Sequence, residues 1–184
     1  LKHNDGYMPY ASGTAFSLFS RSSAAYLAGG YTGGGVTLRS ALESRGFSVN
    51  EKLWDFYDKG TGSSYQRGTG SINYGAAEDF AINEVPIDVI TSEAGLTDTF
   101  GGTTAVFVLS RVVGEGRDMP RSMYQHTDIP EDKVKSYVEP DSVELGVLRY
   151  LNENFDDIVL LVNSCGAMEL GWVEDFEHIH TVLY

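Results

Sequence analysis

A glutamate between two glycines carries the clearest chemical signal in this sequence. The run GEGRD begins at Gly114 and places Glu115 and Asp118 shortly after the apolar stretch 104–112. Glycine neighbours have no side chains to shield the carboxylate, and they allow backbone conformations that other residues resist. The pattern therefore fits a carboxyl group that reaches toward a ligand. A solvent-exposed turn acid fits it equally well, and the spacing alone does not choose between the two.

The single cysteine is a second candidate. Cys165 follows the apolar run 157–163, and ligands in doubly wound sheets bind where such strands end. His178 or His180 would have to serve as its base. No nucleophile-elbow frame surrounds this cysteine, and most lone cysteines are small buried hydrophobes. A Cys165-dependent hydrolase is therefore the less favoured alternative, and the His-x-His spacing is weak support for a metal.

A cluster of glycines lies between residues 29 and 35 and includes Gly33 and Gly34. It matches neither the dinucleotide fingerprint nor the phosphate loop, because no Lys-Ser/Thr pair follows it. We therefore interpret it as a loop of close backbone approach that precedes a helix.

These candidates must be positioned by alternating strands and helices. Apolar runs predict strands at 14–20, 47–49, 104–112, 157–163 and 180–184, and helical spacing predicts helices at 37–45, 51–59 and 168–176. The stretch 60–75 is rich in Gly and Ser and is predicted to be irregular. This alternation indicates an α/β fold with a mainly parallel sheet and helices on both faces.

Local signals mark where several helices begin and end. Gly46 stops the first helix, and Asn50 caps the second. Asp141 with Glu144 forms a capping box, which opens a helix with Leu145, Leu148 and Leu151 on one face.

Composition excludes several classes of protein. The 184 residues are 42% hydrophobic, which excludes a disordered chain, and no window reaches the roughly 18 apolar residues of a membrane span. The net charge is −13, and residues 128–184 hold three bases against thirteen acids. Nucleic acid and membrane partners are therefore not expected. A single cysteine favours a reducing, cytoplasmic location.

The segment Val106–Pro120 resembles the strand and loop of the C-terminal domain in glycoside hydrolase family 3, the β-glucosidase family, which reads S-R and then G-E-G-x-D-R. Four further regions resemble the family in the same order: 1–6, 15–37, 42–57 and 163–172.

The resemblance implies one three-layer α/β/α sandwich of about six strands over residues 1–184. In the family this domain packs on an N-terminal barrel that supplies the aspartate nucleophile, and the barrel and the last strand region are expected to be absent here. Glu115 corresponds to the general acid/base, and Asp118, Gly33 and Gly34 to residues near the sugar. The implied reaction is retaining hydrolysis of terminal non-reducing β-linked sugars, with a β-linked oligosaccharide or glycoside as substrate. No metal or organic cofactor is implied, and the chain alone is expected to be inactive.

Two other interpretations stay open beside this one. The domain could be a non-catalytic module for carbohydrate recognition or interdomain packing, or it could be the Cys165-dependent hydrolase. If Gly114 and Gly116 give Glu115 its reach, we expect the segment 114–138 to be mobile in the isolated domain. Rigid packing of that segment on its own domain would favour the exposed-acid interpretation.

We predict that the isolated chain self-associates. It ends inside the apolar run 180–184 and is expected to lack its barrel, so it should expose apolar surface. Light scattering across a concentration series measures this directly. A strictly monomeric species at high concentration would contradict the prediction.

Overall fold

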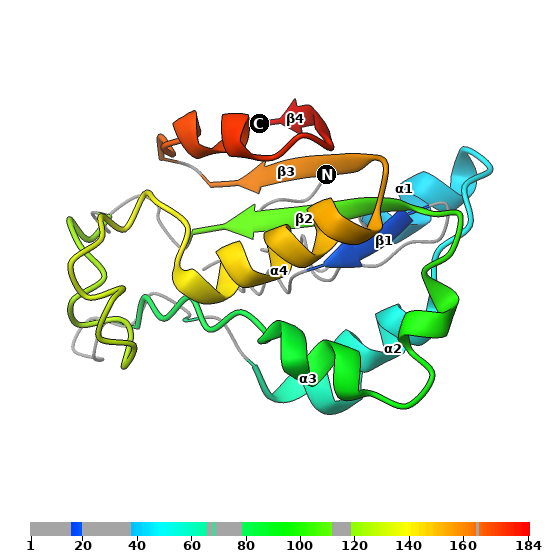
Figure 1. Cartoon of the computed structure of the whole chain (residues 1–184), viewed down its shortest axis with the longest axis horizontal. Coiled ribbons are helices and arrows are strands. Elements are labelled where there is room, and N and C mark those ends of the chain that lie inside the picture. The colour runs from blue at the N-terminus through cyan, green and yellow to red at the C-terminus, as the bar shows by residue number, and fades with distance from the viewer. Residues whose placement is uncertain (1–15, 20–37, 66–67, 69–78, 112–118, 165) are drawn as a thin grey trace, which may run out of the picture.

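The sheet of this domain is parallel. A computed structural model describes residues 16–19, 38–65, 68, 79–111, 119–164 and 166–184. It contains four strands in the order β1-β2-β3-β4 (Figure 1). All neighbouring pairs are parallel. The bounds are Phe16–Phe19 for β1, Thr104–Ser110 for β2, Ile158–Asn163 for β3 and Ile179–Leu183 for β4. The predicted α/β class is confirmed, although about six strands were expected and the described residues hold four.

Strand β2 is buried on both faces because helices cover the sheet from two sides. Successive side chains of a strand point to opposite faces. Phe107 and Leu109 belong to the large core cluster that includes Leu148. Val106 and Val108 belong to a second cluster on the opposite face. The fold is therefore a three-layer arrangement, with the sheet in the middle.

Helix α1 (Leu38–Ser44) covers the second face, and it ends as its sequence predicts. Leu38 and Leu42 pack against the cluster that contains Val106. Gly46 has a φ of +86°, a left-handed conformation that glycine adopts without strain. The predicted helix stop is confirmed.

Helices α2 (Glu51–Asp58) and α4 (Ser142–Asn154) lie on the first face. The Asn50 side chain accepts a hydrogen bond from the Leu53 N–H at 3.1 Å, so the predicted cap of α2 is confirmed. Both bonds of the predicted capping box of α4 are present. Helix α4 follows β2 and precedes β3 in the chain, and Figure 1 shows it lying along the sheet. Within the described part of the chain, no helix is both long and apolar enough to cross a membrane.

Two predicted elements differ from the structure. The stretch 47–49 is not a strand, because Phe47 is 42% exposed and only Val49 makes a β-bridge. The predicted helix 168–176 is wrong in type and length, since only Gly171–Asp175 forms a 3-10 helix. A short apolar run does not determine its own secondary structure, which depends on the strands or helices that pack against it.

Three short elements were not predicted. Helix α3 spans Ile87–Ser92, and 3-10 helices lie at Thr61–Ser64 and Thr97–Thr99. The first of these 3-10 helices lies inside the stretch predicted to be irregular. Helices this short lack enough turns to show a periodic apolar pattern.

We predict that Asn50→Ala lowers the free energy of unfolding by about 1–2 kcal/mol, because it removes the cap of α2. It also removes the 2.9 Å hydrogen bond from the Asn50 amide to the Thr99 hydroxyl. Urea unfolding of the chain measures the change. Asn154→Ala, at the exposed end of α4, serves as the control and should change stability by less than about 0.5 kcal/mol. Equal stability of the two variants would contradict the prediction.

Candidate functional site

The predicted site residues lie outside the described residues, but the structure describes the frame around one of their segments. Glu115 and Asp118 fall in 112–118, Gly33 and Gly34 in 20–37, and Cys165 is itself outside the described ranges. In the sequence, segment 112–118 begins one residue after β2 has ended. The residue between them is Arg111, which is buried.

Arg111 uses all five of its guanidinium N–H groups. Its Nη1 and Nη2 donate to the two carboxylate oxygens of Glu144 at 2.8 and 2.9 Å. Nη1 also donates to the Ser110 carbonyl at 2.9 Å, and Nε donates to the Tyr137 carbonyl at 2.7 Å. The remaining N–H donates to the Glu139 carbonyl. This planar fork therefore joins the end of β2, the start of α4 and the chain between them.

The Arg111–Glu144 ion pair is fully removed from water. Both side chains are 0% exposed. Burial acts to lower the pKa of Arg111, but the charge and hydrogen bonds of Glu144 outweigh it and hold that pKa above its usual value. Removing one partner of such a pair would leave an uncompensated buried charge, which is strongly destabilising. The pair therefore holds these parts of the chain together where β2 ends.

Residues 119–139, which we call the lobe, pack against the domain. Met123 and Tyr137 form a buried cluster with Phe80 and Ile82. The Tyr137 hydroxyl donates to the Phe80 carbonyl at 2.9 Å. This packing speaks against the expected mobility for residues 119–138. Residues 114–118, which include Glu115, lie outside the described residues, and the expectation for them stays a prediction. Sequence reasoning missed this packing because Phe80 is 57 residues from Tyr137.

A buried carboxylate ties the lobe to α4. The Asp132 side chain is 0% exposed and lies 2.8 Å from the ammonium of Lys135. It accepts hydrogen bonds from the backbone N–H and the hydroxyl of Ser142 at 2.7 to 3.0 Å. Burial acts to raise the pKa of Asp132, but the bonds from Lys135 and Ser142 prevail and lower it below the usual carboxyl value.

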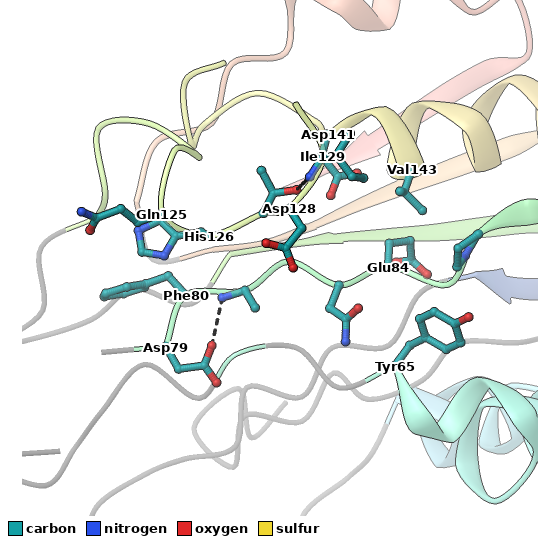
Figure 2. A pocket seen from close by; sticks show the side chains of 14 residues that line it. Tyr65, Asp79, Phe80, Glu84, Gln125, His126, Asp128, Ile129, Asp141 and Val143 are labelled. Carbon is teal, nitrogen blue, oxygen red and sulfur yellow. Dashed lines mark hydrogen bonds between the residues drawn. The ribbon is translucent and has the colours of Figure 1, made fainter. Parts of the chain in front are cut away.

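An open cleft of about 430 Å³ is lined by residues 125–129 of the lobe and by residues of the segment that begins at residue 79. Figure 2 shows Gln125, His126 and Asp128 from the lobe together with Asp79 and Phe80 from the other segment. Carboxylate and amide groups of this kind bind hydroxyl groups by hydrogen bonds. In the described ranges, no three histidine, cysteine or carboxylate residues converge as a metal site requires. Nothing in the local sequence pointed to this cleft, because its walls are far apart in the chain.

His178 and His180, which were considered as bases for Cys165, lie near the end of the sheet where β3 and β4 begin. Ile179 pairs with Ile158 at the beginning of β3, so His178 lies at the edge where the strands start. Ser164 follows the end of the six-residue β3, about 20 Å further along. His178 Nδ1 is also 2.5 Å from the Phe155 carbonyl. The structure therefore gives no support to His178 or His180 as a base near residue 164.

We predict that Asp132→Asn lowers the free energy of unfolding at pH 7 by about 1–3 kcal/mol, because the buried partners lose a charged acceptor. The folded pKa of Asp132 is depressed, so its contribution is present above the unfolded pKa and is lost as the pH falls through the folded pKa. Urea unfolding should therefore show the difference from the original chain shrinking toward about pH 3. The exposed Asp128→Asn is the matched control. A loss that is the same at both pH values would contradict the prediction.

Comparison with protein families finds no model that matches this chain. A curated protein, beta-glucosidase A from Butyrivibrio fibrisolvens, is 25% identical over 201 residues, and the match covers 100% of this chain but 23% of that protein. A solved structure of a beta-glucosidase from Paenibacillus barengoltzii has a TM-score of 0.48 and 22% identity, covering 76% of this chain and 13% of that one. The curated match confirms the predicted resemblance: along its whole length, the chain is similar to one part of a β-glucosidase.

Proposed function

We propose that the chain is the acid/base-bearing domain of a retaining β-glycosidase, and that residues 1–184 form one domain of a longer enzyme of family 3. The proposal is carried by the match of the whole chain to 23% of a protein named beta-glucosidase A. A barrel domain elsewhere in the longer protein would supply the nucleophile. The substrate class is a glycoside with a terminal, non-reducing β-linked sugar.

In this proposal Glu115 is the general acid/base. It protonates the oxygen of the leaving group while a carboxylate of the barrel attacks the sugar, and it then deprotonates the water that hydrolyses the glycosyl-enzyme. Retention requires the two carboxyl groups to lie about 5–5.5 Å apart. The acid must also be protonated at the start, which requires a raised pKa. One of the two groups would come from outside this chain, so the isolated chain is expected to be inactive.

The described frame supports this assignment. Glu115 follows Arg111 by four residues, and Arg111 lies at the carboxyl end of β2. Ligands of parallel α/β sheets bind at this edge. We propose that Asp118, Gly33 and Gly34 contact the sugar, because the family resemblance places them there.

A non-catalytic module for carbohydrate recognition is the second candidate. The open cleft between the lobe and residues 79–86 supports it, since its amide, imidazole and carboxylate groups suit hydroxyl groups. Such a module would bind sugar without any need for Glu115. The two candidates therefore differ in what the loss of Glu115 does.

We predict that Glu115→Ala in the full-length enzyme slows hydrolysis of alkyl β-glycosides by about 10²–10⁴-fold, because their leaving groups need a proton. An activated aryl glycoside leaves without one, so this substrate should accumulate glycosyl-enzyme. Azide needs no base and should restore turnover as a β-glycosyl azide. Steady-state kinetics and mass spectrometry of the intermediate measure these effects.

Glu131→Ala is the matched control, because this glutamate is exposed on the lobe. It should leave both rates unchanged. Equal, modest losses on the two substrates without azide rescue would refute the assignment of Glu115 and favour the recognition module.

A further inference from the structure

We propose that Arg111 and Glu144 are positioning residues for the reaction, joining both ends of the segment 112–136, which carries Glu115 and most of the lobe, to helix α4. This inference rests on the proposed function, and it concerns a pair to which that function assigns no step. Arg111 begins the segment at the end of β2, and Tyr137 and Glu139 lie where the lobe returns to α4.

The pattern of hydrogen bonds is the first argument. The guanidinium donates to the carbonyls of Tyr137 and Glu139, which lie 26 and 28 residues further along the chain. It also donates to the carbonyl of its neighbour Ser110. One planar group thus joins the departing and returning ends of the same stretch. An apolar contact could hold these ends close together, but only directional bonds set their orientation.

The anchoring of Glu144 is the second argument. Glu144 lies in the first turn of α4, where its carboxylate also accepts the Asp141 N–H at 3.0 Å. Val147 and Leu148 of the same helix are fully buried in the main core. The pair therefore ties the flanks of the segment to a packed helix. Groups held by rigid elements are positioned more precisely than groups held by loops.

The energetics of burial are the third argument. A buried ion pair pays a desolvation cost for both charges, and well-packed apolar residues of similar volume often give equal or greater stability. Stability alone therefore does not require an arginine with five satisfied N–H groups at this place. Geometry does require it, because lysine offers three donors without the planar fork.

The test uses the full-length enzyme with two variants, Arg111→Lys and the double variant Arg111→Met/Glu144→Leu. We expect Arg111→Lys to lower kcat on an alkyl β-glycoside by about 10²-fold, the loss expected from a displacement of about 1 Å. KM should change much less than kcat. Cleavage of the activated aryl bond should be less affected, and azide should restore turnover, as for Glu115→Ala.

The double variant separates positioning from stability. It removes both charges together, so we expect its melting temperature to stay close to that of the original enzyme. Its kcat on the alkyl glycoside should nevertheless fall at least as far as that of Arg111→Lys. Asn50→Ala is the control for a loss of stability that arises far from this segment in the sequence. It should leave the ratio of alkyl to aryl rates unchanged.

The outcomes are distinguishable. If Glu115→Ala shows the leaving-group effect and Arg111→Lys behaves like Asn50→Ala, this inference fails and the proposed function stands. If Glu115→Ala shows no such effect, the proposed function fails and this inference fails with it. If neither Arg111 variant folds, the pair serves stability alone and the inference is overturned.

Discussion

The buried ion pair of Arg111 and Glu144 is the interaction on which the carboxyl edge of this domain depends. Two charges without any exposed surface persist only if every polar atom finds a partner. Arg111 therefore donates to three backbone carbonyls, those of Ser110, Tyr137 and Glu139. Glu144 also accepts the backbone N–H of the N-cap residue Asp141 in the capping box of α4. In this way the pair joins three parts of the chain: the end of β2, the end of the lobe and the start of α4.

The chain is strongly acidic, so it is informative which of its carboxylates have a cationic partner. With 26 acids against 13 bases, one-to-one pairing leaves at least half of the carboxylates without a cation. The fully buried ones nevertheless have strong partners: Asp132 has Lys135 and Ser142, and Glu144 has Arg111. Four carboxylates line the cleft, of which Asp79 and Asp128 are exposed and Glu84 and Asp141 are buried. Asp132 and Glu144 thus hold the frame together, and the exposed Asp79 and Asp128 add polar groups to the cleft.

The frame has a direct bearing on the proposed chemistry. A general acid in a shared active site has to meet a nucleophile that another domain provides, so its position relative to the sheet must be reproducible. The elements that flank segment 112–118 are β2 and the lobe, and both pack against the main core or its satellite cluster.

The sequence by itself determined the features whose energies depend on near neighbours. The cap at Asn50, the capping box of Asp141 and Glu144, and the stop at Gly46 each involve residues within four positions, so their residue types were sufficient. The apolar runs of β2 and β3 were visible because strands buried on both faces must be apolar throughout. The candidate Glu115 also came from the sequence, through its glycine neighbours and the family resemblance.

Only the tertiary structure decided which partners Arg111 would find, how Tyr137 would meet Phe80 and where the cleft would open. These contacts join residues 26 to 57 positions apart, and no local pattern encodes them. The physical reason is that a buried polar group is stabilised by whichever partner the fold brings to it. The tertiary structure also decided the stretch 47–49, where Phe47 is 42% exposed and only Val49 makes a β-bridge among the described residues.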